Sequence, residues 1–428
     1  MNSSPRTASE HVAQLASCPP ELLALITREL LASDVTRIFA CGYLVLNRKL
    51  LNGGVLEMSV DYSNQESLVW RFNLLRRFKH LRTFRLTSPR RMITGFEWFA
   101  LELLPKELTT LELNYVGAVR VWIRSISSNV GDPRILIHTV NGKFPFLKSL
   151  TLKELDSGWN GGQREHSDPP VSSSVLNWTP DIRENFLKGL PLSLRTLTLS
   201  GFGTWRDSDF KLFPRKLTSL TLYSDAYNMS YLPKTLKSIS LNYSTNYMAE
   251  STIESLPRSI TSFSAPYDSF TYSIITCLPK HLLHLRIPAA LNIFPISVFA
   301  NSFHHLLTLE ASAWDESSSS NPPVFPPSLT ELSLGDWSMT RTFLDTVPRT
   351  LQTLHLGTKS VVQDFFGLFL PPKLQTLTLR NNTNLNKDCL HYLPKHVLYF
   401  STATTKFRCL APTNSTDLSA SEEDSDSE

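Results

Sequence analysis

The residues that could do chemistry are few and scattered along the chain. Five of the histidines, His80, His284, His304, His305 and His355, have no carboxylate at a helical spacing that would complete a metal or proton-transfer motif. The sequence contains no HExxH, GxSxG, GxGxxG or P-loop pattern. The five cysteines are dispersed and form no CxxC pair. We therefore expect a non-enzyme with no catalytic residue, no metal site and no cofactor.

Composition and charge narrow the class of protein. The chain has 428 residues, of which 41% are hydrophobic and 19% are charged, with a formal net charge of +4. No membrane-spanning stretch is visible, and residues 1–17 have no apolar stretch typical of a secretory signal. An odd number of scattered cysteines fits reduced thiols better than a disulfide framework. These features predict a cytoplasmic or nuclear protein without a membrane partner, and a disordered arm at residues 1–17.

Leucines recur in a fixed phrase, which in residues 370–382 reads LPPKLQTLTLRNN. The first leucine of each phrase is an anchor, and further apolar residues follow three and five positions later. From Leu194 onward the anchors recur at intervals of roughly 23 residues. The anchors are Leu81, Leu108, Leu147, Leu194, Leu217, Leu236, Ile260, Leu282, Leu306, Leu329, Leu351, Leu374 and Val397. Such regularity indicates a repeat array, with insertions near residues 114–146 and 153–190.

Each phrase contains one short strand. In LTELSL (329–334), Leu332 and Leu334 lie on one face of an extended chain and Ser333 lies on the other. A single strand of this kind cannot bury its apolar face, whereas stacked copies share a continuous core. The period and the LxxLxL pattern resemble the leucine-rich repeat over residues 75–405. The fold class that this resemblance implies is an α/β solenoid with a parallel sheet on its concave face and short helical or 3-10 turns on its convex face.

Two features depart from the common repeat. The asparagine usual after the third leucine occurs clearly only at Asn382, so a continuous asparagine ladder is not expected. A proline precedes most anchors by three positions, as in LP-type repeats of bacterial effectors and slime-mould proteins. The short apolar stretches before it, such as 340–347, 361–370 and 386–393, are predicted to form helical turns that the proline ends.

A basic residue often follows that proline. The basic residues at this position are Lys106, Arg215, Lys234, Arg258, Lys280, Arg349 and Lys395. One interpretation is an anion-binding or nucleic-acid-binding stripe. The interpretation that we favour is that each cation lies at the C-terminus of a short helix, where the helix dipole attracts positive charge. No RNA-binding motif accompanies the stripe, which argues against nucleic acid as a partner.

The exposed strand positions would form the recognition surface. Most carry threonine or serine, which covers a sheet without necessarily binding anything. Specificity for a partner would therefore depend on the few exposed strand positions that carry a residue other than threonine or serine. Those selected as the substrate face are Tyr223, Tyr243, His284, Arg286, Glu310, His355 and Arg380.

Residues 18–50 have a different pattern. Pro20 and Glu21 begin an apolar series with helical spacing, and Ser33 and Asp34 separate it from a second one. The segment resembles the F-box, although Cys18 replaces the usual leucine and the closing tryptophan is absent. That resemblance implies docking on the Skp-type adaptor of a cullin ubiquitin ligase. The residues that it assigns to the adaptor contact are Pro20, Leu22, Leu23, Ile26, Leu30, Val35 and Ile38. The alternative is a helical cap that only shields the first repeat.

Residues 409–428 form a predicted disordered acidic tail. From residue 414 onward it contains six acidic residues and no Lys or Arg. Ser419, Ser421 and Ser425 each have an acid three residues later, the pattern that acidophilic kinases phosphorylate. A second possibility is that the tail only aids solubility.

The predicted domain order is a disordered arm (1–17), an F-box-like hairpin or cap (18–60), a solenoid of about 13 units (61–408) and the acidic tail (409–428). The function that this order implies is the non-catalytic substrate-recognition subunit of a Skp–cullin–F-box ubiquitin ligase, with a protein substrate on the concave face. The alternative is a leucine-rich-repeat interaction scaffold without a ligase link.

Overall fold

The computed structural model divides the chain into two units, which are described separately. Unit 1 comprises residues 1–226 and 231–236, and unit 2 comprises residues 227–230 and 237–428. The residues that the structure describes are 19, 57–61, 78–87, 104–114, 143–153, 180–200, 205–223, 229–242, 250–265, 272–287, 297–311, 324–335, 341–357, 370–379, 393–402 and 406–408.

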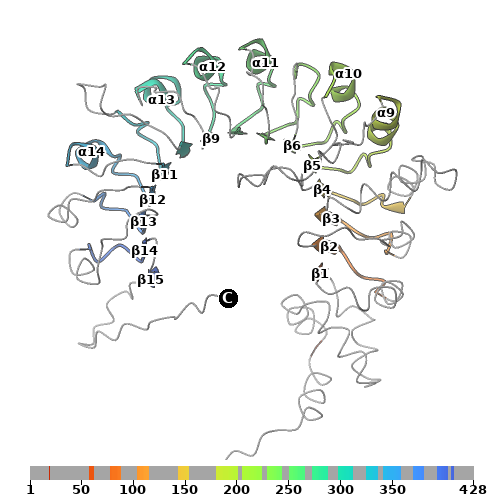
Figure 1. The fold of residues 1–428 in the computed structure, drawn as a ribbon, viewed down its shortest axis with the longest axis horizontal. Coiled ribbons are helices and arrows are strands. Elements are labelled where there is room, and N and C mark those ends of the chain that lie inside the picture. Colours follow the sequence, from red (N-terminus) through yellow and green to blue (C-terminus); the bar gives the residue numbers. More distant parts are fainter. Residues whose placement is uncertain are drawn as a thin grey trace, which may run out of the picture. The chain divides into compact units, whose positions relative to one another are not determined.

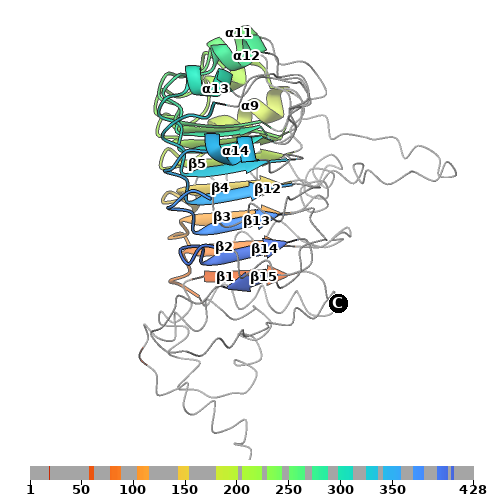
Figure 2. The ribbon, with the colours of Figure 1, turned by 90° about the vertical axis from the view of Figure 1, so that its left-hand side faces the viewer.

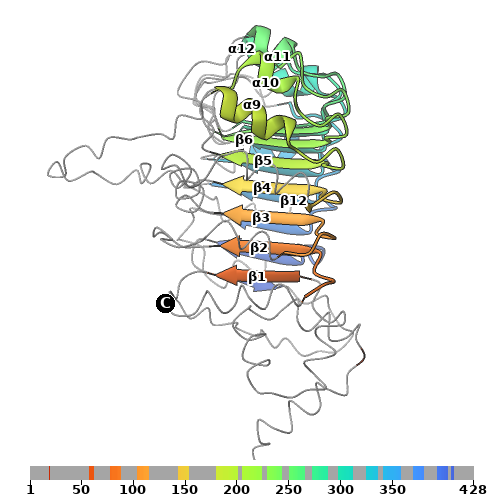
Figure 3. The same ribbon diagram turned by 90° about the vertical axis from the view of Figure 1, so that its right-hand side faces the viewer.

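Unit 1 contains a parallel sheet in which each strand pairs with the next one along the chain. Its strands are β1 (Glu57–Asp61), β2 (Thr83–Thr87), β3 (Thr110–Asn114), β4 (Ser149–Lys153), β5 (Thr196–Ser200) and β6 (Ser219–Tyr223). Figure 3 shows them stacked with their arrows pointing the same way. β1 crosses the boundary predicted at residue 60, so the sheet begins within the segment expected to be a helical hairpin or cap.

Unit 2 has the same organisation. Its strands are β7 (Ser238–Leu241), β8 (Ser262–Ser264), β9 (His284–Ile287), β10 (Thr308–Ala311), β11 (Glu331–Leu334), β12 (Thr353–Leu356), β13 (Thr376–Leu379), β14 (Tyr399–Thr402) and β15 (Lys406–Arg408). Strands β7 to β14 are parallel neighbours in sequence order, whereas β15 runs antiparallel to β14. Figure 2 shows β12 to β15 stacked in this order.

The anchor and the residues three and five positions after it form the core of each layer. In the layer of β6, Leu217, Leu220 and Leu222 are all 0% exposed. The register places these positions side by side in successive strands, for example Leu220 opposite Leu197. Burying one leucine side chain contributes about 1.5–3 kcal/mol relative to leaving it exposed. The predicted leucine-rich-repeat-type solenoid is therefore confirmed in both units.

A tight turn leads into each of the strands β2 to β14. The N–H of the anchor donates to the carbonyl of the residue three positions earlier, as in Leu217 to Pro214 at 3.0 Å and Leu374 to Pro371 at 3.0 Å. Phenylalanine replaces the proline at Phe78, Phe144 and Phe303, and the same hydrogen bond forms there. The proline thus fixes the first residue of a β-turn, because its φ is restricted by its ring.

Short helices lie on the other side of the sheet from the exposed strand positions. They are α9 (Pro180–Lys188), α10 (Asp207–Phe210), α11 (Glu250–Glu254), α12 (Tyr272–Cys277), α13 (Ser297–Ser302) and α14 (Arg341–Thr346). Figure 1 shows α9 and α10 outside the strands of unit 1, and α11 to α14 outside those of unit 2. α14 confirms the helical turn predicted at 340–347. The turns predicted at 361–370 and 386–393 lie outside the described residues except for Leu370 and Leu393.

Hydroxyl groups satisfy the carbonyls of the entry turns. The residue just before the anchor reaches back to the turn of the preceding layer. Thr235 Oγ1 lies 2.7 Å from the carbonyls of both Arg215 and Leu217, and Thr350 Oγ1 lies 2.6 Å from the carbonyl of Leu329. Because buried carbonyls need donors, these hydroxyls stabilise the stacking of layers. The slots that the asparagine ladder would occupy lie outside the described residues.

Candidate binding surface

The open face of each sheet carries the side chains two and four positions after the anchor. Register aligns these positions in two columns, and hydroxyl residues dominate both. In unit 2 the columns are Ser238, Ser262, His284, Thr308, Glu331, Thr353, Thr376 and Tyr399, and beside them Ser240, Ser264, Arg286, Glu310, Ser333, His355, Thr378 and Ser401. The charged residues among these hydroxyls are concentrated on β9, β10 and β11, which makes this part chemically distinct.

In unit 2 an ion pair and a hydrogen-bonded chain lie next to each other. Arg286 Nε lies 2.9 Å from Glu310 Oε2, on the paired strands β9 and β10. His284 Nδ1 lies 3.1 Å from Thr308 Oγ1, which donates to Glu331 Oε2 at 3.3 Å. We call Arg286, Glu310, His284, Thr308 and Glu331 the unit 2 cluster.

The polarity of the hydrogen bonds in the unit 2 cluster differs from that of a catalytic triad. The Thr308 hydroxyl donates its proton to Glu331, so His284 must donate to Thr308 through Nδ1. A nucleophilic hydroxyl requires the opposite polarity, with the imidazole accepting its proton. The Arg286 side chain is 61% exposed, whereas that of Glu310 is 25% exposed. The carboxylate therefore holds an arginine whose remaining donors face solvent.

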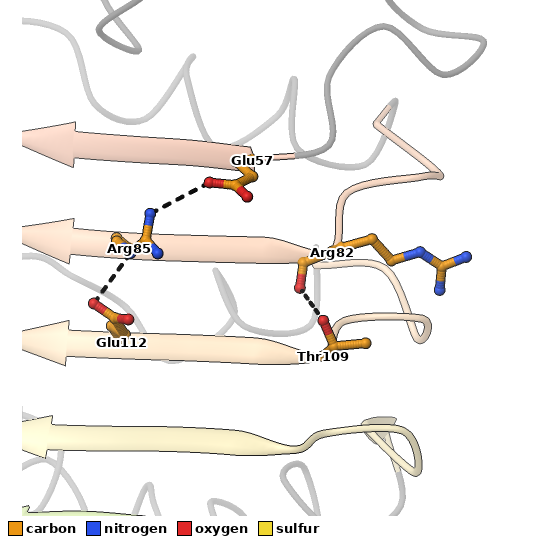
Figure 4. Close-up of polar contacts among 5 residues, drawn as sticks. All are labelled: Glu57, Arg82, Arg85, Thr109 and Glu112. Atoms are coloured by element: carbon orange, nitrogen blue, oxygen red, sulfur yellow. Dashed lines mark hydrogen bonds and ion pairs between the residues drawn. The ribbon is translucent and has the colours of Figure 1, made fainter. Parts of the chain in front are cut away.

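A similar group lies on the open face of unit 1. Arg85 lies between two carboxylates, 3.4 Å from Glu57 and 3.2 Å from Glu112, as Figure 4 shows. In the same view the hydroxyl of Thr109 donates to the backbone carbonyl of Arg82 at 3.1 Å. Two carboxylates around one exposed arginine leave this group with net negative charge. The unit 2 cluster also has one arginine and two carboxylates, but only one of these carboxylates, Glu310, pairs with the arginine.

The aromatic residue selected in unit 1 is held by a cation. Tyr223 is half-buried at the end of β6, and Lys153 Nζ lies 5.8 Å from the centroid of its ring. The contact is a cation–π interaction, worth about 0.5–1 kcal/mol at an exposed site. Tyr223 thus lies on the open face, with Lys153 over one side of its ring.

The structure describes only some of the selected residues, and their assignment to a substrate face stays a prediction. His284, Arg286 and Glu310 come together in the unit 2 cluster, and His355 lies half-buried on β12. Tyr243 and Arg380 lie outside the described residues, as do Ser419, Ser421 and Ser425. The residues assigned to the adaptor contact, Pro20, Leu22, Leu23, Ile26, Leu30, Val35 and Ile38, also lie outside them.

Sequence reasoning missed Glu57, Arg85 and Glu112, and it treated Thr308 and Glu331 only as strand positions. These neighbours could have been found from the sequence, because aligning the repeats on their anchors places Arg85 beside Glu112 and Thr308 beside Glu331. The alignment could not predict contacts between residues that are not opposite each other in the register. Arg85 contacts Glu57 in this way, although Glu57 lies opposite Thr83.

Other candidate groups carry no chemistry. Cys277 lies on α12, and its thiol lies 3.7 Å from Glu254 Oε1. Burial and the neighbouring Glu254 carboxylate raise the pKa of the thiol, which keeps it protonated and weakly nucleophilic at neutral pH. Among the described residues no group of three or more His, Cys, Asp and Glu side chains could hold a metal ion.

The seven cations that follow the turn prolines are all exposed. They lie in the β-turns and not within a helix. In the layer of α11 the helix ends at Glu254 and the cation is Arg258, while in the layer of α14 the helix ends at Thr346 and the cation is Arg349. The dipole acts mainly within the last turn of a helix, and these cations follow the helix ends by three or four residues, so the helix-dipole interpretation stays a prediction. The turn itself determines where these cations lie.

Comparison with known proteins adds little beyond the fold. No protein-family model matches the chain, and no curated protein matches it. Among solved structures, an internalin from Listeria monocytogenes is similar at 15% sequence identity and a TM-score of 0.35, over 83% of this chain and 88% of that one. At these values the similarity says nothing about function. None of the described helices is long and apolar enough to cross a membrane.

Proposed function

We propose that this chain is a non-catalytic protein-binding solenoid, whose open face in unit 2 binds a protein partner through the unit 2 cluster. The observation that carries the proposal is the 61% exposed Arg286, held in place by Glu310 on a face otherwise covered by hydroxyls. A positioned arginine loses little conformational entropy on binding, and arginine is enriched among the residues that dominate interfaces. The partner surface would offer a carboxylate or carbonyl to the free guanidinium donors and a donor to Glu331.

The test compares full-length variants in affinity capture from cells. We expect Arg286→Ala/Glu331→Ala to weaken binding of the principal partner by about 30-fold or more, the effect of losing one hot spot. The matched control is Glu250→Ala/Asn301→Ala, which alters exposed residues on α11 and α13. Equal capture by both variants would contradict the proposal, provided that their thermal unfolding is unchanged.

We further propose that this recognition serves a Skp–cullin–F-box ubiquitin ligase, with a protein substrate on the open face. The support is the F-box-like pattern of residues 18–50 placed directly before the repeats. A recognition subunit of this kind acts by proximity and needs no catalytic residue of its own. Its place of action would be the cytoplasm or the nucleus. Without the adaptor contact, the chain would be an interaction scaffold and residues 18–50 would serve only as a cap.

Binding of purified Skp-type adaptor to the full chain separates these two roles. The ligase role predicts measurable binding that Leu23→Asp/Ile26→Asp reduces at least tenfold, because charges at apolar docking positions must be desolvated. The scaffold role predicts that the wild type and this variant bind equally poorly. The Arg286→Ala/Glu331→Ala variant should retain adaptor binding in either case.

A further inference from the structure

Cations line one edge of the sheet in unit 2. They lie in the turns that enter the strands, or at the residue that follows the anchor. The members of this basic turn edge are Lys237, Arg258, Lys280, Arg349, Lys373 and Lys395, and all six are exposed. The turns of unit 2 contain no acidic residue between the proline position and the residue after the anchor. The edge is therefore purely positive, unlike the open face of unit 2, which carries charges of both signs.

The positive charges of this edge form two groups, in the layers of β7 to β9 and of β12 to β14, and are not neutralised locally. Neighbouring strands lie about 4.8 Å apart, which is shorter than the Debye length of about 8 Å at physiological salt. The potentials of cations in adjacent layers therefore add, as for Arg349, Lys373 and Lys395 in the turns of β12, β13 and β14. The turns of β10 and β11 contain no Lys or Arg, so Lys280 lies about 14 Å from Arg349. Within the described part of unit 2, none of the six forms an ion pair. The same edge also carries imidazoles, including His396, whose Nε2 lies 3.0 Å from the Pro371 carbonyl.

The antiparallel strand β15 directs the chain back to this edge. After each parallel strand the chain continues from the edge of the sheet opposite the turn by which it entered. β15 reverses this direction, because Lys406 pairs with Ser401 and Arg408 pairs with Tyr399, the first residue of β14. Arg408 therefore lies at the edge of the sheet where the turn that contains Lys395 enters β14.

The segment that follows has the complementary charge and enough length. Residues 417–428 contain six acidic residues and no Lys or Arg. Residues 409–416 span up to roughly 26–29 Å when extended. The turns of β13 and β12 lie about 5 and 10 Å from that of β14. The acidic residues can thus reach Lys373 and Arg349 without stretching the linker.

We propose that residues 417–428 dock along the basic turn edge of unit 2, pairing their carboxylates with Lys395, Lys373, Arg349 and the cations beyond them. Tethering raises the effective concentration of the segment to the millimolar range, so several weak ion pairs suffice to hold it. This contact is separate from the open face and goes beyond the proposed protein-binding function.

Phosphorylation would strengthen the contact. Ser419, Ser421 and Ser425 lie among the acidic residues, and each phosphate adds about 1.5–2 negative charges at neutral pH. Phosphate oxygens also bind arginine in a bidentate manner, which suits Arg349 and Arg258. Treatment with an acidophilic kinase is expected to make docking more resistant to salt.

Zero-length crosslinking of the full chain tests the proposal. Carbodiimide joins a carboxylate to a contacting lysine amine as an amide, with loss of one water. We expect peptides that link Glu422, Glu423 or Asp424 to Lys373 and Lys395, at least tenfold less abundant in ~0.5 M salt, where the Debye length falls to about 4 Å. Lys188, which pairs with Glu184 within α9, supplies an internal positive control. An equal mixture of 14N- and 15N-labelled protein distinguishes links within one chain from links between chains.

Two full-length variants complete the test. Lys373→Glu/Lys395→Glu should reduce crosslinking of the acidic segment to the remaining edge lysines, Lys280 and Lys237, by about tenfold. Lys188→Glu, an exposed lysine of α9 in unit 1, should leave that yield unchanged. Links spread evenly over exposed lysines, or links only between chains, would overturn the proposal.

A competition experiment identifies a different occupant. If a fluorescent RNA 12-mer binds the wild type as tightly as a variant whose six acidic residues are replaced by Asn and Gln, the segment does not cover the edge. That result would overturn the proposal and favour an external polyanion. Docking predicts that the neutralised variant binds the RNA about tenfold more tightly than the wild type does, because each displaced ion pair is worth only a fraction of a kcal/mol.

Discussion

Asp209→Asn is expected to lower the free energy of unfolding of unit 1 by about 3–5 kcal/mol, the cost of leaving a buried charge unpaired. Asp209 Oδ2 lies 2.8 Å from Arg183 Nε, and both side chains are only 4% exposed. Burial lowers the pKa of Arg183 and Asp209 opposes this shift, but the guanidinium remains charged at neutral pH. The substitution keeps the size of the side chain and an oxygen to accept from the Arg206 N–H. It therefore removes the charge and replaces one carboxylate oxygen by an amide NH2, with little change in volume.

Equilibrium unfolding in urea, with hydrogen exchange assigned to α9 and β5, measures this effect. Glu184→Gln is the matched control, because Glu184 on the same helix forms an exposed pair with Lys188. We expect Glu184→Gln to change the free energy of unfolding by less than about 0.5 kcal/mol. The double variant Arg183→Met/Asp209→Leu should recover most of the lost stability, since apolar replacement of a buried pair is often neutral. A double variant no more stable than Asp209→Asn would refute the ion-pair explanation.

The surroundings of this pair explain why we expect a large effect. Trp205 is 1% exposed, and the guanidinium carbon of Arg183 lies 5.6 Å from its ring. Phe210 and Phe213 pack against Trp205 with ring centroids 6.3 and 5.7 Å away. Water cannot readily reach Arg183 in this aromatic surrounding, so solvent does not compensate for a missing carboxylate.

Phe144→Ala is expected to destabilise unit 1 by about 3–5 kcal/mol, as for other large-to-small changes at buried aromatic residues. Phe144 occupies the position of the turn proline in the layer of β4, and its side chain is 0% exposed. The backbone hydrogen bond from the Leu147 N–H to its carbonyl, 3.1 Å long, does not depend on the side chain. The substitution therefore leaves the turn intact and creates a cavity beneath it.

Phe146→Ala in the same turn provides the control. Phe146 is 59% exposed, so its truncation should change stability by less than about 1 kcal/mol. Hydrogen exchange should localise the loss in Phe144→Ala to β3, β4 and β5, because each layer of a solenoid contacts only its neighbours. Equal effects of the two substitutions, or loss of protection spread evenly over both units, would contradict this account.

Most of the architecture could be predicted from the repeat because its information is local. The anchor recurs in every layer, and most layers also have apolar residues three and five positions after it and a turn proline before it, so one phrase determines a strand, its buried face and its entry turn. Phe144 and Phe146 illustrate this: their positions relative to Leu147 suffice to assign one to the core and the other to solvent. Repetition then dictates the parallel stacking, since an isolated layer cannot bury its leucines.

Contacts between residues outside the repeating phrase could not be predicted in this way. Arg183 and Asp209 lie on two helices that the repeat pattern does not specify, and only packing brings them together. The unit 2 cluster required both the register of β9 to β11 and the rotamers of long side chains. β15 runs antiparallel to β14, unlike the strands before it, and the spacing of the anchors does not predict this reversal.

The sequence by itself thus determined the repeating layer, its leucine core and its parallel sheet, because a periodic apolar face is buried by stacking identical layers in parallel. Only the tertiary structure decided which charges meet on the open face, which ion pair is buried behind it and at which edge the chain leaves the sheet. These depend on distances between layers and on the direction of one antiparallel strand, which no residue pattern within a single layer encodes.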